Sequence, residues 1–474
     1  MCGISLALYI LAIVYKIIIF IIALERKAIM KNKYNILEDQ PIKVILFFSI
    51  PVLLGLFFQQ IYTTVDTVIV SKTLGQKALA ATGCLNSVNF LILGFCNGMA
   101  SGFSIPIAQI FGSGDEKKLK KYLGNIIWVY LFFAIVITVI SVCLTQTILI
   151  VTNTPKDIFS MAYIYMLVIF LGIPTQFAYN TLSGIMRSLG DVKTPLYILI
   201  GCSLLNVGLD LIFIMILHLG VFGAALATVL SEALSAIGCL VIMYKQYTFI
   251  HLTKDDVKIN KTCIIELLKD GIPMGLQMSI CGIGSLLLQS SVNALGSVYV
   301  ASVTASERIW QILQSVTAAI GTSLTVYCGQ NIGANKITRV KQGVRAGVIM
   351  AMIYCFVSSL FIYFFRNQIV SIFIDKDALQ LIQLTKQYLV INALFFWAQG
   401  LIHTVRFSLQ GMGYARISLL AAILEMIARA VTGLFIVPLF GYIAVCFSNA
   451  LAWVLASTFI VVYYLILIKK MKEV

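Results

Sequence analysis

Charged residues are scarce in this chain, and long polar stretches are absent. Only 11% of the 474 residues are Asp, Glu, Lys or Arg, whereas a typical soluble domain contains about a quarter. Hydrophobic residues make up 60%, and no polar block is long enough to form a soluble domain. The sequence therefore predicts a polytopic membrane protein whose mass lies within the bilayer.

Sequence signals for catalysis and metal clusters are also missing. The 11 cysteines show no CxxC or Cys/His spacing, and the 3 histidines lie far apart, so no zinc site or disulfide framework is indicated. There is no nucleophile and base pair and no Walker phosphate loop. We therefore expect a protein that is not an enzyme, has no resident cofactor, and draws its energy from an ion gradient rather than from ATP.

The basic residues outnumber the acidic ones and gather in alternate connections between apolar segments. The formal net charge is 34 − 19 = +15. Because short basic loops beside membrane segments follow the positive-inside rule, we expect no nucleic-acid partner. The pattern predicts a multi-pass protein of the cell membrane, with both ends of its helical core in the cytoplasm.

Twelve apolar segments begin at Ile42. Each is long enough to cross about 30 Å of hydrocarbon as a helix. They lie at approximately residues 42–70, 79–111, 122–150, 158–186, 194–217, 220–246, 263–294, 299–329, 341–365, 379–410, 414–437 and 441–468. The sequence therefore predicts an all-α fold with twelve transmembrane helices.

A further apolar segment, residues 4–24, precedes this core. It lacks the positive start and the small-residue cleavage site of a signal peptide. Two interpretations remain open: an extra amino-terminal helix, which would place Met1 outside, or upstream sequence attached to a chain that starts at Met30. The polar leader beginning at Met30 is typical of a cytoplasmic start and favours separating residues 1–29 from the core.

The chain also contains an internal repeat. Four landmarks recur in the same order at spacings of 221 to 223 residues: Ser49-Ile50-Pro51 with Gly271-Ile272-Pro273, Gln109 to Gly112 with Gln330 to Gly333, Ser188 to Gly190 with Gly411 to Gly413, and Gly220 with Gly441. The alternative is a chance recurrence of Gly and Pro in helical hairpins.

Six segments separate the repeat partners, so the two halves have the same orientation in the membrane. We expect two six-helix lobes, residues 30–247 and 263–474, joined by a polar loop at 248–262. A parallel repeat of this kind binds its substrate in the cleft between the halves, near the midplane of the bilayer.

Acidic residues inside apolar segments mark the candidate site. Asp66 lies in the first segment, Asn206 and Asp210 are four residues apart in the fifth, and Thr228 and Glu232 are four apart in the sixth. A charge at the centre of a membrane helix costs roughly 2.5–3.5 kcal/mol, and residues four apart share a helix face. The set offers hard oxygen ligands for Na⁺, and a close carboxylate pair can share a proton. The alternative is that Asp66 and Asp210 pair with backbone and hydroxyl groups.

The second half lacks this acidic pattern. The positions that correspond to Asp66 and Asp210 are a leucine (287 or 288) and Gly433. Glu425 and Arg429, four residues apart, are interpreted as a structural ion pair. Prolines within apolar segments permit bends, and Pro51 is the candidate hinge of the first segment.

Several stretches resemble the multidrug and toxic compound extrusion (MATE) family over residues 34–470. They are Ser49-Ile-Pro51, Tyr62-Thr-Thr-Val-Asp66-Thr67, Gly83, Ile105-Pro-Ile-Ala-Gln-Ile-Phe-Gly112, Arg187-Ser-Leu-Gly-Asp191, Asn206-Val-Gly-Leu-Asp210 and Gly223-Ala-Ala-Leu-Ala-Thr228. The resemblance implies two six-helix lobes around a cleft with alternating access, and exchange of Na⁺ or H⁺ for bulky, mostly cationic organic compounds.

In the branch that this chain is most similar to, the ion site lies in the amino-terminal lobe. Carried over by position, the cation site comprises Asp66, Asn206, Asp210 and Thr228, and any bound metal is Na⁺. Gln59, Tyr62 and Met278 are candidates for the substrate cavity. We expect small organic cations and membrane lipid as partners, and no obligate protein partner.

Two rival functions are distinguishable. A lipid-linked oligosaccharide flippase of the same broader fold group should present a large basic cavity for pyrophosphate, whereas Asp66 and Asp210 point toward cation handling. A non-transporting membrane enzyme or assembly protein would need a reactive cluster or a long soluble module, and the sequence has neither. The sequence therefore favours a secondary antiporter.

Overall fold

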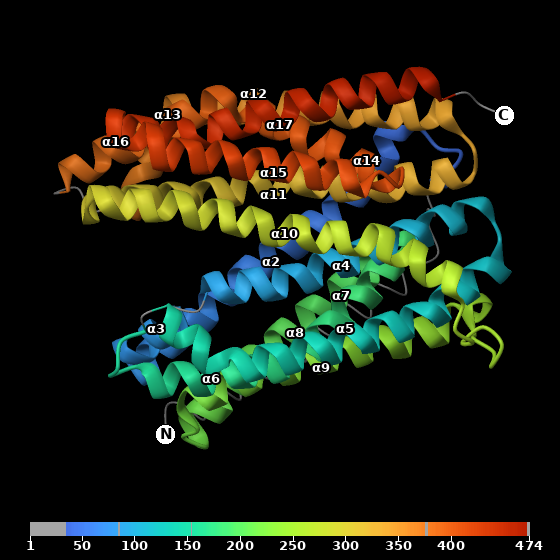
Figure 1. Cartoon of the computed structure of the whole chain (residues 1–474), viewed down its shortest axis with the longest axis horizontal. Helices are drawn as coiled ribbons and strands as arrows, with labels where there is room; N and C mark the ends of the chain where they lie inside the picture. The colour runs from blue at the N-terminus through green and yellow to red at the C-terminus, as the bar shows by residue number, and fades with distance from the viewer. Residues whose placement is uncertain (1–34, 84–85, 153, 375–377, 472–474) are drawn as a thin grey trace. The chain divides into compact units, whose positions relative to one another are not determined.

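The computed structural model describes residues 35–83, 86–152, 154–374 and 378–471. Over these ranges the chain is almost entirely helical and has no β-strand, as Figure 1 shows. This confirms the predicted all-α fold class. The predicted extra helix at residues 4–24 lies outside the described residues.

The helices form two compact units. Of the described residues, Asn35 and Leu54–Leu268 belong to the first unit, and Ile36–Leu53 with the chain from Lys269 onward belong to the second. The helices up to residue 250 are α2 (Pro41–Leu74), α3 (Gln76–Gly83), α4 (Asn86–Ser113), α5 (Glu116–Val151), α6 (Phe159–Leu171), α7 (Ile173–Ser188), α8 (Lys193–Leu211), the π-helical turn η1 (Ile212–Ile216), α9 (Gly220–Gln246) and the 3₁₀ turn η2 (Thr248–Ile250).

The remaining helices repeat this succession of long and broken elements. They are α10 (Lys261–Leu295), α11 (Ser297–Gly333), α12 (Ile337–Phe373), α13 (Leu379–Leu401), the π-helical turn η3 (Ile402–Arg406), α14 (Phe407–Gly411), α15 (Ala415–Val431), the π-helical turn η4 (Thr432–Ile436), α16 (Val437–Phe440) and α17 (Tyr442–Lys470).

Eleven spans in the described part of the chain are long and apolar enough to cross a membrane, and the pair α6 and α7 provides a twelfth if it forms one bent span. The pair bends by 43° at Gly172, just before Pro174. Pro174 cannot donate a backbone hydrogen bond, and its carbonyl accepts one from the Tyr130 hydroxyl at 2.8 Å. The single segment predicted at 158–186 is therefore a broken helix.

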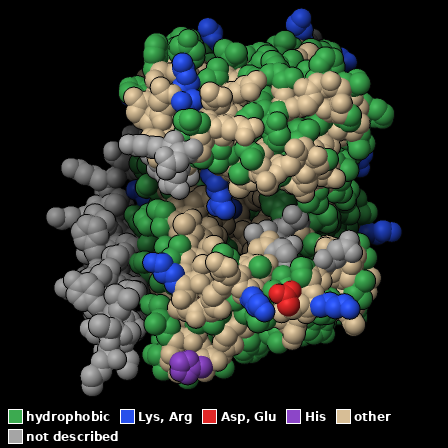
Figure 2. Space-filling model, turned by 90° about the vertical axis from the view of Figure 1, so that its left-hand side faces the viewer, with side chains coloured by type: hydrophobic (Ala, Val, Ile, Leu, Met, Phe, Trp, Pro, Cys, Tyr) green, Lys and Arg blue, Asp and Glu red, His purple; other side chains and the backbone are tan. Residues whose placement is uncertain are grey.

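Apolar side chains cover much of the molecule's surface. Figure 2 shows one face on which hydrophobic side chains are widespread and lysine and arginine side chains lie singly among them. Phe132, Ile353, Phe356 and Phe435 are among the large hydrophobic residues that are at least 60% exposed. An exposed apolar surface of this extent requires a hydrocarbon environment, so the chain is a multi-pass membrane protein.

The internal repeat is visible in the backbone. Gly190 and Gly413 have φ values of 95° and 88°, and Gly220 and Gly441 both have a φ of 60°. A side chain is disfavoured in this left-handed region, which explains why both halves retain glycine at these landmarks. The π-helical turns η1 and η4 also begin 432 − 212 = 220 residues apart.

The Arg187 to Asp191 motif has a structural role. Asp191 Oδ1 accepts hydrogen bonds from the backbone amides of Lys193 at 3.1 Å and Thr194 at 3.0 Å, at the start of α8. Its other oxygen accepts the Tyr247 hydroxyl at 2.7 Å. Burial, together with the Asp191 carboxylate, raises the pKa of Tyr247. The motif therefore fixes the start of α8 against the end of α9.

The polar loop after α9 is held against α5 of the first unit. Asn125 donates to the carbonyl of Lys258 at 3.3 Å and accepts from the backbone amide of Asn260 at 2.8 Å. The Trp128 indole donates to the Val257 carbonyl at 2.8 Å. The predicted lobe boundaries around residues 248–262 stay a prediction.

The start of α2 is fastened to the second unit. Arg339 donates to the carbonyls of Ile36, Glu38 and Asp39 at 2.6 to 3.2 Å, and the Ser49 hydroxyl lies 3.2 Å from that of Ser323. These contacts explain why Ile36–Leu53 groups with that unit. Pro51 lies inside the uninterrupted helix α2, three residues before Leu54, where the first unit begins. Its role as a hinge stays a prediction.

Candidate functional site

The acidic residues of the first half meet inside the first unit. Asp66 comes from α2, Asp210 from the last turn of α8, and their carboxyl groups interact directly with each other. Asp210 is fully buried. The phenol of Tyr165, on α6, lies close enough to interact with both. The structure thus brings together two carboxylates that are separated by 144 residues in sequence.

These carboxylates are not neutralised by the surrounding protein. Oδ1 of Asp66 and both carboxylate oxygens of Asp210 are buried without a hydrogen-bond partner among the described residues. None of the ion pairs in that part of the chain involves either residue. A buried carboxylate without a partner is costly in its charged form, and a proton or a cation would offset that cost.

The register of α8 places Asn206 one turn before Asp210, on the same face. Asn206 is buried, and its Oδ1 has no hydrogen-bond partner among the described residues. Directly after Asp210 the helix widens into the π-helical turn η1. Such turns occur frequently at functional sites. The amide oxygen therefore adds one more unsatisfied oxygen to this face.

An apolar cluster lies one helical turn beyond each site residue. Val70, Ile214 and Ala224 belong to one buried cluster, and they are four residues away from Asp66, Asp210 and Thr228 respectively. Tyr165 packs against the same cluster. These side chains limit the access of water from that end, which makes the unpaired carboxylates more costly in their charged form.

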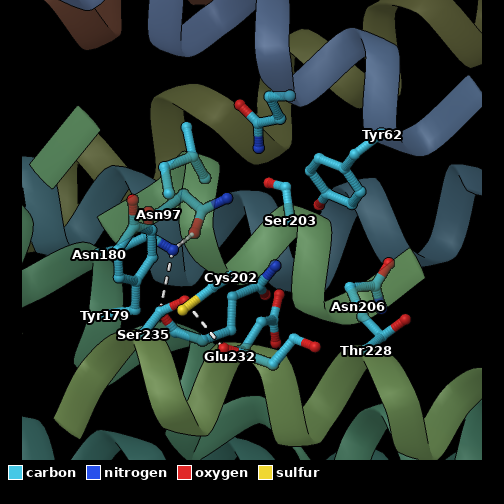
Figure 3. Close-up of a pocket in the computed structure, with 14 residues that line it drawn as sticks. Tyr62, Asn97, Tyr179, Asn180, Cys202, Ser203, Asn206, Thr228, Glu232 and Ser235 are labelled. Carbon is cyan, nitrogen blue, oxygen red and sulfur yellow. Dashed lines mark hydrogen bonds between the residues drawn. The ribbon is translucent and has the colours of Figure 1, made fainter. Parts of the chain in front are cut away.

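A polar cavity of about 70 Å³ adjoins this face of α8. Figure 3 shows Asn206 and Thr228 on one side of it, with Glu232 and Ser235 further along α9 and Tyr62 on α2. The other lining residues are Gln59, Asn97, Gln176, Tyr179, Asn180, Leu199, Cys202, Ser203 and Ser231. Four of the predicted residues, Gln59, Tyr62, Asn206 and Thr228, therefore line one cavity.

Glu232 is a third carboxylate in this region. It lies four residues after Thr228 in the sequence, but the predicted cation site did not include it. In the structure it lines the cavity and interacts with the side-chain amide of Gln176 and with Tyr62. It forms no ion pair in the described part of the chain. The site region thus holds three carboxylates without a cationic partner.

The sequence missed the amide-rich wall of the cavity. Asn180 on α7 donates to Asn97 Oδ1 on α4 at 2.7 Å and to the Gln176 carbonyl at 2.9 Å. Gln176 Oε1 is buried without a partner among the described residues. Amides inside apolar segments were the available signal, but the sequence does not show which of them face the same cavity.

Two predicted residues belong to the second unit. Met278 is half-buried on α10, and Pro51 is buried in the part of α2 that groups with that unit. Neither lines the polar cavity of the first unit. Their assignment to a substrate cavity and to a hinge stays a prediction.

The buried Glu425 of the second unit is compensated by cations, unlike Asp66 and Asp210 of the first. Glu425 pairs with Arg406 and, at 3.4 Å, with Arg429, and all three side chains are buried. Glu307 accepts hydrogen bonds from the Tyr388 hydroxyl at 2.6 Å and from Asn449 at 3.1 Å. The interpretation of Glu425 and Arg429 as an ion pair is confirmed, and Arg406 joins it.

The donors present fit a hard cation or a proton. Within the described ranges, no three or more His, Cys, Asp or Glu side chains are grouped to hold a metal ion. Carboxylate, amide and hydroxyl oxygens from Asp66, Asp210, Asn206 and Thr228 suit Na⁺, although the Thr228 hydroxyl also donates to the Ala224 carbonyl at 3.2 Å. The buried oxygens without partners in this set are consistent with such a ligand.

Comparison with known proteins identifies relatives over most of the chain. The MatE family profile matches residues 51–212 and 273–435, one match in each half of the repeat. The probable multidrug resistance protein YoeA of Bacillus subtilis is 29% identical over 337 residues, which cover 70% of this chain and 73% of that protein. The multidrug export protein MepA of Staphylococcus aureus is 23% identical over 422 residues, 88% of this chain and 92% of that protein.

Solved structures share the fold. An outward-facing multidrug resistance MATE family transporter of the MOP superfamily has a TM-score of 0.86 and 22% identity, covering 94% of this chain and 100% of that chain. A MOP superfamily transporter from Pyrococcus furiosus, described as having a binding pocket of reverse polarity, has a TM-score of 0.84 and 23% identity, covering 92% of this chain and 99% of that chain.

Proposed function

Because this chain belongs to the MATE family of transporters, we propose that it exports bulky, mostly cationic organic compounds across the cell membrane in exchange for Na⁺ or H⁺. The names of its relatives, a multidrug resistance protein and a multidrug export protein, support drug export. The distribution of basic loops supports a cell-membrane location with both core ends in the cytoplasm.

The observation that carries this proposal is the uncompensated carboxylate pair in the first unit. Asp66 and Asp210 lie against each other without a cationic partner in the described part of the chain, whereas the second unit pairs Glu425 with two arginines. Carboxylates inside the membrane are costly and usually serve a function such as ion binding. An exchanged cation supplies that ligand during part of the transport cycle.

In the exchange step, Asp66 and Asp210 take up one Na⁺ or one proton. Na⁺ would be held by oxygens of both carboxylates, of Asn206 and of Thr228, whereas a proton would be shared by the two carboxyl groups. Either ion removes the repulsion between the carboxylates and lets α2 pack closer to α8. The packing of α2 against α8 therefore differs between the ion-free and the ion-bound site. This difference couples ion binding to a conformational change.

The polar cavity of the first unit is smaller than a drug-sized ligand requires. Drug-sized ligands occupy pockets of about 300–1,000 Å³, whereas the polar cavity measures about 70 Å³. It has room for a few water-sized groups only. Binding of a drug-sized substrate in this cavity therefore requires its walls to separate.

Within the widened cavity, Glu232 attracts the cationic group of the substrate, while Tyr62 offers an aromatic face and Gln59 a hydrogen-bonding amide. These residues come from α2 and α9, on the same cavity as Asn206. Met278 is retained as a proposed substrate contact of the second unit. The ion and substrate sites adjoin, so occupancy of one disfavours the other.

We expect Glu232→Gln to weaken the binding of organic cations about tenfold. At an effective dielectric constant of about 20, the attraction between the Glu232 carboxylate and a substrate cation about 10 Å away is roughly 1.7 kcal/mol. A loss of about 1.4 kcal/mol raises the dissociation constant tenfold. Equilibrium binding of ethidium to the purified variant, followed by fluorescence, measures the change. An uncharged compound of similar size is the control, and its affinity should stay the same. Equal losses for both ligands would place Glu232 in the packing of the cavity instead.

Efflux in inverted membrane vesicles tests the proposed exchange. Ethidium transport is measured with a Na⁺ gradient or a proton gradient imposed separately, at zero membrane potential. For one-for-one exchange, a hundredfold gradient stores about 2.7 kcal/mol and sustains up to about a hundredfold accumulation. One gradient should drive transport and the other should not. Transport that ignores both gradients would contradict ion exchange.

The flippase alternative has no support in the comparisons described above, since none of the named relatives or structures is described as a flippase. The acidic cavity of the first unit also repels a pyrophosphate group. We therefore retain a single proposed function.

A further inference from the structure

A groove of about 320 Å³ lies between α12 and α13 of the second unit, two helices that pack side by side along their length (Figure 1). Its floor consists of small residues, Cys355, Ser359 and Ala393, and the Ser359 hydroxyl donates to the Ala393 carbonyl at 2.7 Å. Large apolar side chains form its walls. They are Met352, Phe356, Leu360, Tyr363, Val390, Leu394 and Trp397.

The groove is open to the membrane. Phe356, Tyr363 and Trp397 on its walls are 67%, 50% and 44% exposed, whereas Cys355 and Ala393 on its floor are buried. Because the residues on the floor are small and those on the walls are large, side chains of α12 and α13 leave an open channel between the two helices. A hydrocarbon chain fits the shape and polarity of such a channel.

Two cations mark one end of this groove. The floor hydrogen bond sets Ser359 opposite Ala393, and because α12 and α13 are consecutive and antiparallel, positions seven residues further along face each other again. Those positions are Arg366 on α12 and Lys386 on α13, about 10 Å beyond the hydrogen bond at 1.5 Å per residue. The groove therefore ends between an arginine and a lysine.

Arg366 is positioned toward the groove. Its guanidinium carbon lies 4.9 Å from the ring centroid of Tyr363, a wall residue, and the guanidinium also donates to the Tyr363 carbonyl. In the described part of the chain, neither Arg366 nor Lys386 forms an ion pair. Lys386 is half-buried within a membrane-spanning helix, where a cation without an anionic partner is costly.

We propose that this groove binds an anionic glycerophospholipid, with one acyl chain between α12 and α13 and the phosphate between Arg366 and Lys386. Paired cations at the end of an apolar groove match the charge and shape of a lipid with a negative headgroup. A zwitterionic lipid fills the groove less well because its positive group repels both side chains. The site is independent of the ion site and of the proposed transport function.

Tryptophan quenching by brominated lipids tests the site, because Trp397 lines the groove. The full chain is reconstituted in phosphatidylcholine vesicles containing a minor fraction of brominated phosphatidylglycerol or of brominated phosphatidylcholine. A Trp128→Phe variant leaves Trp397 as the one exposed tryptophan, since Trp310 and Trp453 are buried. One cation near the headgroup raises the affinity for an anionic lipid about fivefold. Two cations should therefore make the affinity of the groove for brominated phosphatidylglycerol about 25-fold higher than that for brominated phosphatidylcholine.

Three variants make the result specific. Arg366→Gln with Lys386→Gln should reduce the preference to about one. Ala393→Leu, which fills the floor, should weaken quenching by the anionic lipid while the charges remain. In a Trp397→Phe chain, Trp128 on α5 is 42% exposed and should show no preference for either lipid. Retained helicity and elution volume establish that each variant folds.

Two results would overturn the proposal. Equal quenching of Trp397 by both lipids, or a preference that survives removal of both cations, would mean that the groove takes bulk lipid without recognising a headgroup. Protection of Trp397 from both brominated lipids would mean that another polypeptide, such as a second copy of the chain, covers the groove.

Discussion

Asp66→Asn and Asp210→Asn should each abolish ion-driven efflux. Under a hundredfold gradient of the coupling ion, the wild-type chain should sustain accumulation of up to about a hundredfold, and either variant should sustain none. The physical reason is that an asparagine is neutral throughout the cycle. Each single variant leaves only one carboxylate, so there is no repulsion between two carboxylates for the ion to relieve. Ion binding then no longer distinguishes two conformations, and a ligand without differential affinity shifts no equilibrium. Ethidium transport in inverted vesicles measures the loss.

Two controls separate this effect from misfolding. Asp157→Asn changes a carboxylate that is exposed and pairs with Lys77 at 3.8 Å, and it should transport like the wild type because exposed pairs contribute about 0–1 kcal/mol. The Asp66 and Asp210 variants should also elute normally and still bind ethidium. If either variant retained gradient-driven transport at wild-type level, the coupling site would lie elsewhere.

Glu425→Gln should destabilise the second unit by about 3–5 kcal/mol, because it leaves Arg406 and Arg429 buried without a carboxylate. The side chains of Arg406 and Arg429 are only 7% and 11% exposed, so little water reaches them to replace the lost partner. Equilibrium unfolding of the purified chain in mixed micelles with increasing SDS measures the loss. A lower expression level and earlier thermal unfolding should accompany it.

Glu307→Gln is the matched control for that variant. Glu307 has two neutral hydrogen-bond donors, Tyr388 and Asn449, and a glutamine oxygen accepts the same bonds, so we expect a loss of about 1 kcal/mol. Adding Arg406→Gln to Glu425→Gln should recover part of the stability, since it removes one of the unpaired charges. Wild-type stability of Glu425→Gln together with lost substrate binding would instead make Glu425 a substrate contact.

Hydropathy was sufficient to predict the helices and their number. Long apolar runs have few options in a bilayer other than a helix, and the twelve predicted segments correspond to eleven spans and one bent pair. Pro174 is one of the prolines within apolar segments that permit a bend, but the sequence does not show whether the helix only kinks there or breaks, as it does at Gly172. The neighbouring Tyr130 hydroxyl, which satisfies the Pro174 carbonyl, is a tertiary contact that no local pattern contains.

The candidate site shows where pattern reasoning stops. Asn206 and Asp210 share a face by their spacing, so the sequence predicts their proximity directly. That Asp66 meets Asp210, and that Glu232 shares a cavity with Asn97 and Gln176, depends on how five helices pack. Many amides and hydroxyls lie inside apolar segments here, and the sequence does not show which of them face one another.

The sequence by itself determined that this protein spans the membrane many times as helices, that its halves repeat in parallel, and that carboxylates lie within the first half. Each of these follows from a pattern in the sequence itself: hydropathy, landmarks that recur at a fixed spacing, or a charge in an apolar run. The spacing of Glu425 and Arg429 also predicted their ion pair. Only the tertiary structure decided that Arg406 joins that pair and that Asp66 and Asp210 lie together without a cationic partner among the described residues, because these contacts depend on how separate helices pack.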